Sequence, residues 1–93
     1  MNARQTAAAA LLAVEQEGSY SNLVLEPWFR RENLSPQDRA FCSALFYGVL
    51  ERCITLDWVL DRYSRTPVRK LEPEIRAALR LGALQLTAFS SVP

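Results

Sequence analysis

Histidine is absent from this 93-residue sequence, which has only two cysteines and three well-separated glycines. Without histidine the chain lacks the commonest general base and the commonest metal ligand, and two cysteines cannot complete a four-ligand zinc site. Three isolated glycines do not form a phosphate-binding loop. We therefore expect no catalytic, cofactor-binding or metal-binding residues in this chain, and no enzymatic activity of its own.

Long hydrophobic runs are also missing. The longest covers the eight residues 7–14, whereas a membrane-spanning helix needs about 20. No basic segment followed by an apolar stretch opens the chain, as it would in a signal peptide. The sequence therefore predicts a cytoplasmic protein without membrane contact, whose thiols are reduced. Hydrophobic residues still make up 49% of the chain, which excludes intrinsic disorder and predicts one small domain or a piece of one.

Helical patterns run through the whole chain, and no strand pattern competes with them. Asn2 and Gln5 form a capping box, Gly18 is a typical stop signal, and Ser35-Pro36 is a typical start signal. The sequence thus predicts an all-α fold of about five helices with a loop over residues 64–70. The predicted helices cover residues 3–17, a short or broken segment from Ser21-Asn22 through Pro27 to near Asn33, residues 36–53, residues 55–63, and a last segment from Pro73 onward.

The two cysteines, Cys42 and Cys53, fall on the predicted helix over residues 36–53. Their separation corresponds to about 16 Å along a helix axis, which is beyond disulfide reach. Because both lie among apolar residues at helical spacing, we interpret them as core residues.

Two tryptophans and two aspartates have both a functional and a structural interpretation. Trp28 and Trp58 could stack on bases, but aromatic residues on amphipathic helices favour the core or a domain contact. Asp57 and Asp61 share a helix face. With no nucleophile or metal ligand nearby, they are predicted to be solvated rather than catalytic.

Arginine supplies ten of the eleven basic residues, and their distribution is uneven. Residues 62–80 contain six basic side chains against two acidic ones, a local net charge of +4. Arginine makes planar, bidentate contacts with phosphate and stacks on bases, so this segment is a candidate nucleic-acid surface. A solvated basic face is the alternative interpretation.

Several segments together resemble a known family, the NusB-like helical domains. The resemblance covers nearly the whole chain, and no single segment carries it alone. Those segments are Asp38-Arg39-Ala40-Phe41, residues 45–50, Leu56-Asp57, residues 75–86 and Val92-Pro93. The opening Ala3-Arg4 with Tyr20-Ser21-Asn22 is similar to one branch, the N-terminal domain of the RsmB/Sun/Fmu ribosomal RNA cytosine-5 methyltransferases. The related branch is the NusB transcription antitermination factor.

The resemblance implies that residues 1–93 form a partial NusB-like domain that lacks the C-terminal helices of the family. It implies a non-catalytic RNA-binding domain that helps dock small-subunit ribosomal RNA. The methyltransferase domain, which uses S-adenosylmethionine in the parent family, is absent from these residues. The alternatives are a stand-alone NusB-type factor, a helical protein-interaction module, or a brace that packs on its own methyltransferase domain. Faces exposed by truncation could also produce a homodimer.

The candidate RNA-binding residues are all basic. Arg4 lies in a first helical turn, where free backbone N–H groups also suit a phosphate. For the two arginines near the C-terminal end, the structural alternatives are an ion pair between Glu72 and Arg76 and a stem of Arg80 buried between helices. Phosphate neutralisation by these residues predicts an RNA affinity that falls with salt. The complete set is Arg4, Arg65, Arg69, Lys70, Arg76 and Arg80.

Overall fold

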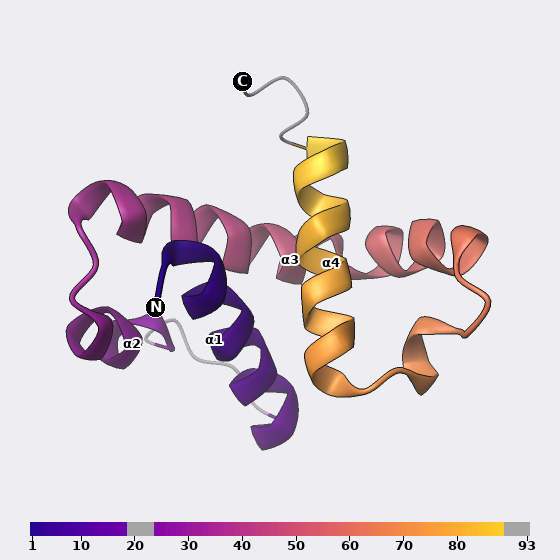
Figure 1. Cartoon of the computed structure of the whole chain (residues 1–93), viewed down its shortest axis with the longest axis horizontal. Coiled ribbons are helices and arrows are strands. Elements are labelled where there is room, and N and C mark those ends of the chain that lie inside the picture. Colours follow the sequence, from indigo (N-terminus) through magenta and orange to yellow (C-terminus); the bar gives the residue numbers. More distant parts are fainter. Residues whose placement is uncertain (19–23, 89–93) are drawn as a thin grey trace.

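The computed structural model of the chain describes residues 1–18 and 24–88. Over these residues the fold is all-α, as predicted, and no strand is present. Figure 1 shows α4 crossing in front of α3, with α1 beside both and α2 next to the first part of α3. The elements are α1 (Ala3–Glu17), α2 (Leu25–Glu32), α3 (Pro36–Tyr63), the 3-10 helix η1 (Val68–Lys70) and α4 (Pro73–Ala88).

The ends of α1 and α2 follow from local sequence signals. The Asn2 side chain accepts from the Gln5 backbone N–H at 2.8 Å, and the Gln5 side chain accepts from the Asn2 N–H at 3.0 Å. Gly18 ends α1 in the left-handed region at φ 70°, and Asn33 ends α2 at φ 50°. The predicted capping box and both stops are therefore confirmed. The predicted start of the second helix at Ser21-Asn22 lies outside the described residues, as do Tyr20 and Val92-Pro93.

Helix α3 corrects the predicted number of helices. Ser35 caps it by accepting from the Asp38 N–H at 3.1 Å, as expected. The helix is 28 residues long in total, and the predicted boundary after Cys53 falls at a kink inside it, so four α-helices and a 3-10 turn are present where about five helices were predicted. Only Arg52 leaves the helical region, at φ −112° and ψ 17°. No glycine or proline lies between Arg52 and Tyr63, so nothing in this stretch of sequence ends the helix at the kink.

The core lies where α1, α3 and α4 meet. Small side chains let α1 approach closely, since Ala3, Ala7 and Ala10 are all buried. Where α4 crosses α3, a Cβ added to Gly48 would lie 2.8 Å from the Leu84 side chain, so only glycine fits without a shift. Other buried residues from these helices are Leu11, Cys42, Leu45, Phe46, Val49, Leu56, Ala77, Leu81 and Ala83.

Both cysteines are free, as expected from their spacing. Cys42 is buried, and burial raises the pKa of its thiol to about 11. Cys53 is half-buried, and burial also raises the pKa of this thiol. The core interpretation is therefore confirmed for Cys42, while Cys53 lies at the edge of the core. None of the helices in the described part of the chain is long and apolar enough to cross a membrane.

The two glycines within helices provide a matched test of the α3–α4 crossing. Gly82 has nothing within 4 Å of an added Cβ, so Gly82→Ala should stabilise the protein by about 1 kcal/mol through helix propensity. Gly48→Ala gains the same propensity but forces the buried Leu84 to shift, so it should be less stable than Gly82→Ala by about 1–3 kcal/mol. Urea denaturation of both variants measures this difference. Equal stabilities would contradict the close crossing.

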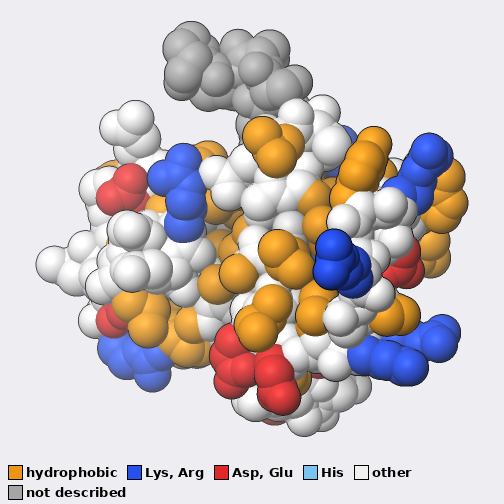
Figure 2. Space-filling view, turned by 45° about the vertical axis from the view of Figure 1, so that its right-hand side comes forward, with side chains coloured by type: hydrophobic (Ala, Val, Ile, Leu, Met, Phe, Trp, Pro, Cys, Tyr) orange, Lys and Arg blue, Asp and Glu red, His pale blue; other side chains and the backbone are white. Residues whose placement is uncertain are grey.

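An apolar groove of about 360 Å³ runs between the end of α3 and α4. Its lining contains no charged side chain; Tyr63 and Leu86 remain 84% and 77% exposed there, and Leu79 is 38% exposed. Figure 2 shows hydrophobic side chains gathered along this part of the molecule. Exposed apolar patches of this kind mark interaction surfaces.

The homodimer suggested by the sequence remains a prediction, and this groove is where it would form. Sedimentation equilibrium over a hundredfold range of concentration should show a mass rising above 10.5 kDa. Leu86→Asp should abolish that rise, because a charge in the interface would be desolvated. A mass that stays at 10.5 kDa throughout would contradict the prediction.

Candidate nucleic-acid interface

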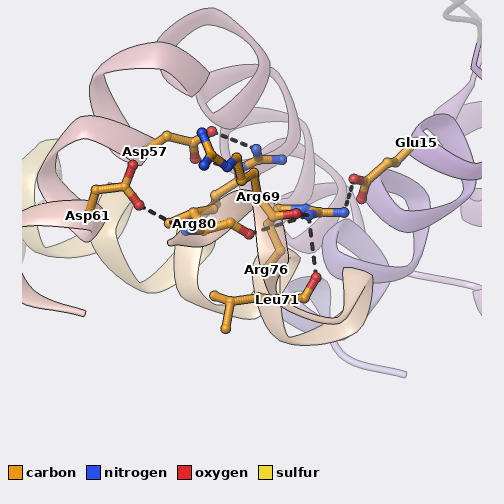
Figure 3. Close-up of polar contacts among 8 residues, drawn as sticks. Glu15, Asp57, Asp61, Arg69, Leu71, Arg76 and Arg80 are labelled. Atoms are coloured by element: carbon orange, nitrogen blue, oxygen red, sulfur yellow. Dashed lines mark hydrogen bonds and ion pairs between the residues drawn. The ribbon is translucent and has the colours of Figure 1, made fainter. Parts of the chain in front are cut away.

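Arg80 ties α4 to the second half of α3. Its Nε and Nη2 atoms donate to Oδ1 and Oδ2 of Asp57, both at 2.7 Å (Figure 3). This hydrogen bonding is the main reason that the pKa of Arg80 is raised. The interpretation of Asp57 as a solvated carboxylate was therefore wrong, and the structural alternative for Arg80, a side chain held between helices, is confirmed. The Arg80 side chain is only 19% exposed.

Arg76 ties α4 to the segment before it and to α1. Its Nη1 donates to the carbonyls of Val68, Arg69 and Leu71 at 3.1–3.3 Å. Its Nη2 forms an ion pair with Glu15 at the end of α1 (Figure 3). Three carbonyls and a carboxylate therefore converge on one guanidinium group, which closes η1 against the helical core.

The predicted ion pair between Glu72 and Arg76 does not form. Glu72 contributes only its backbone carbonyl, which accepts from the Arg76 N–H at 2.9 Å, and its side chain is exposed. Glu15 takes the place of Glu72 because the chain folds α1 back against α4. Both α4 arginines thus have an internal anionic partner, with which an RNA phosphate would compete. Contact of Arg76 and Arg80 with RNA stays a prediction.

Among the described residues, the basic side chains of the segment between α3 and α4 lack the ion-pair partners that Arg76 and Arg80 have. Arg65, Arg69 and Lys70 are exposed, and within residues 1–18 and 24–88 none of their charged groups forms an ion pair. Arg65 and Arg69 line an open hollow of about 310 Å³ together with Asp61 and Ser64. The structure thus brings two predicted site residues together, in a segment that lies away from the start of α1 (Figure 1).

Asp61 and Ser64 shape this segment. The exposed Asp61 accepts from the Val68 N–H at 2.8 Å, which begins η1. The Ser64 hydroxyl donates to the Thr66 carbonyl at 2.7 Å. Asp61 is therefore exposed as predicted, with a structural role that its sequence position did not indicate.

Arg4 lies in the first turn of α1, as predicted, and its side chain is exposed. Its Nε donates to the Gln85 side chain at 2.8 Å, and its guanidinium lies 5.2 Å from the Phe41 ring centre. Both partners are uncharged, so the positive charge of Arg4 is not neutralised. The contact with Gln85 connects residues 81 positions apart.

Arginine–aromatic stacking is the feature that the sequence reasoning missed. Arg31 lies 4.1 Å from the Trp28 ring centre, and Arg62 lies 4.9 Å from that of Trp58. Helical spacing of three or four residues between the members of each pair was the available signal. Trp28 packs partly buried against the core, as predicted, but Trp58 is 60% exposed. Of the two predicted positions for Trp58, the core is therefore wrong, and a domain contact stays a prediction.

The Arg80–Asp57 pair predicts a selective effect on stability. Arg80→Ala leaves a partly buried carboxylate without its partner and should lower the free energy of unfolding by about 1–3 kcal/mol. The control Arg65→Ala removes an exposed charge and should change it by less than about 0.5 kcal/mol. Thermal unfolding followed by circular dichroism measures both. Equal effects of the two substitutions would contradict the structural role of Arg80.

Comparisons with known proteins agree with this helical arrangement. The sequence model of the NusB family matches residues 1–93. The chain is 34% identical, over its full length, to a probable ribosomal RNA small subunit methyltransferase B from Synechocystis sp., of which it spans 21%. It is 40% identical over 82 residues, 88% of the chain, to ribosomal RNA small subunit methyltransferase B from Thermus thermophilus, of which it spans 20%.

The other branch of the family is also represented. The chain is 36% identical over 69 residues, 74% of its length, to the transcription antitermination protein NusB from Halorhodospira halophila, of which it spans 44%. No solved structure matches the chain. The chain thus spans about a fifth of the methyltransferases to which it is similar and less than half of this antitermination protein.

Proposed function

The chain belongs to the NusB family, and on that premise we propose that it is the RNA-docking domain of a small-subunit ribosomal RNA methyltransferase. The names of the methyltransferase relatives support this branch, since their similarity extends over 88–100% of the chain. Such a role would place the protein in the cytoplasm, as expected from the sequence. Its partners would be ribosomal RNA and the methyltransferase domain of the same protein.

One observation carries the proposal. The basic side chains divide into two arginines that are bound internally and a set whose positive charges meet no carboxylate in the described part of the chain. Arg76 and Arg80 belong to the first group and hold the fold. The second group has nine members, and we propose that the four predicted candidates among them, Arg4, Arg65, Arg69 and Lys70, bind phosphates. Neutralising phosphates with such groups releases counterions and supplies RNA affinity.

Methyl transfer itself is not assigned to these residues. S-adenosylmethionine would supply the methyl group in such an enzyme, and it carries a cationic sulfonium and an amino acid end. The apolar groove between α3 and α4 has no charged side chain to hold that end. The hollow beside Arg65 and Arg69 would present cations to a cation. Neither of these two places fits this cofactor, and in our proposal the reaction belongs to another part of a longer protein.

A stand-alone antitermination factor is the second candidate, favoured by the similarity to the Halorhodospira halophila protein. The same unpaired cations would serve RNA binding in either role. The reading frame in the genome distinguishes the two, because the first role requires a methyltransferase domain in the same polypeptide.

RNA binding is tested by removing the unpaired cations. Arg4→Ala, and separately the triple substitution of Arg65, Arg69 and Lys70 by alanine, should each weaken binding to a labelled small-subunit ribosomal RNA fragment. We expect a several-fold loss for the single substitution and about tenfold or more for the triple one, because each lost phosphate contact removes a counterion-release contribution. Fluorescence anisotropy measures both affinities.

Arg30→Ala is the matched control, since it removes an exposed arginine from α2, at the other end of the molecule from η1 (Figure 1). It should leave the affinity within about twofold, as expected for a charge that makes no phosphate contact. Unchanged RNA affinity in the Arg4 and triple variants would overturn the proposal and favour a protein-interaction module.

A further inference from the structure

An exposed stripe of three residues, with a tryptophan in the middle, runs along the second half of α3. Trp58 is 60% exposed and Ile54, one turn earlier, is 87% exposed. Arg62, one turn later, stacks on Trp58 with its guanidinium 4.9 Å from the ring centre. Spacing of four residues puts all three on one face of the helix. The stripe is separate from the apolar groove, which is lined on α3 by Val59, Leu60 and Tyr63.

The hollow beside Arg65 and Arg69 adjoins this stripe. Asp61 lies on the same helix as Trp58, Ser64 is the residue directly after that helix, and both line the hollow. Ser64 follows Trp58 by six positions, which corresponds to about 9 Å along a helix axis. An exposed indole and a pair of guanidinium groups are thus present at the same end of α3.

The positive charge of residues 58–70 favours binding of a polyanion. Residues 58–70 contain four basic side chains and one acidic one, a local net charge of +3. The acidic residue, Asp61, is already hydrogen-bonded to the Val68 N–H. An apolar protein partner would instead fit the uncharged groove between α3 and α4. Figure 2 shows Lys and Arg side chains spaced along the right-hand side of the view, next to hydrophobic ones.

We propose that this end of the molecule binds single-stranded RNA, with an unpaired base stacked on Trp58 and an adjacent phosphate held between Arg65 and Arg69. This inference rests on the proposed RNA binding and specifies where and in what form the RNA is held. A base can stack on an indole only when its face is free, so an unpaired segment is required. Arg62 lies over the ring, and Trp58 is still 60% exposed, which leaves surface for a base.

The intrinsic fluorescence of the chain provides a direct test. Trp28 and Trp58 are the only tryptophans, so Trp28→Phe leaves Trp58 as the single reporter. Decauridine should quench Trp58 in this variant, whereas a blunt RNA duplex of equal length should not. Trp58→Ala should weaken decauridine binding about tenfold, as measured for other stacked bases. If Trp28→Phe does not fold, the difference in quenching between the unmodified chain and Trp58→Phe gives the same information.

Matched arginine substitutions separate stacking from general charge. Arg62→Ala and Arg31→Ala each remove one guanidinium from an indole face, and only Arg62→Ala should reduce affinity for decauridine. Decauridine binding without a change in Trp58 fluorescence would overturn this inference and leave the proposed function standing. Failure of every RNA probe would overturn both. A Trp58 signal that depends on protein concentration but not on RNA would assign the stripe to contact between copies.

Discussion

The close crossing of α4 over α3 is the constraint on which the rest of the structure depends. A side chain at Gly48 would push against Leu84, so the two helices meet at a distance that only glycine permits. That approach brings Arg80 onto Asp57 and places Arg76 between α1 and the segment before α4. Packing at Gly48 and Leu84 and the bidentate pair of Arg80 with Asp57 thus join the same two helices.

This arrangement separates the arginines by function. The planar guanidinium that pairs with two carboxylate oxygens of Asp57 would pair with two phosphate oxygens in the same way. Where the fold supplies a carboxylate, as it does for Arg76 and Arg80, that capacity is used for stability. Where it supplies only neutral partners, as for Arg4, the charge remains available. The net charge of the chain is only +1, but local surfaces are positive enough to suit a polyanion.

Much of the helical structure could be predicted because its signals are local. Asn2, Gly18 and Ser35 act on backbone groups within a few residues of themselves, and the structure confirms all three. The kink at Arg52 was predicted as a break, since the pattern changes there but no glycine or proline shows how far the helix continues.

The candidate site was less predictable, because its contacts join residues that are far apart in the sequence. The ion pair of Arg76 spans 61 positions and that of Arg80 spans 23, so composition near α4 could not identify Glu15 and Asp57 as their partners. Trp58 was expected in the core or at a domain contact, because aromatic residues on amphipathic helices favour such positions. Its exposure depends on which face of α3 the other helices cover. Tertiary packing therefore decides which charges and which rings are free.

The salt dependence of RNA binding by the unmodified chain tests the central claim most directly, namely that unpaired cations dock RNA while the α4 arginines hold the fold. Affinity for a single-stranded ribosomal RNA fragment should be measured between about 50 and 200 mM salt, the range in which counterion release is evident. Three to four phosphate contacts predict a slope of log affinity against log salt of about −2 to −3. Affinity that is unchanged across this range, in a chain shown to be folded, would contradict the account.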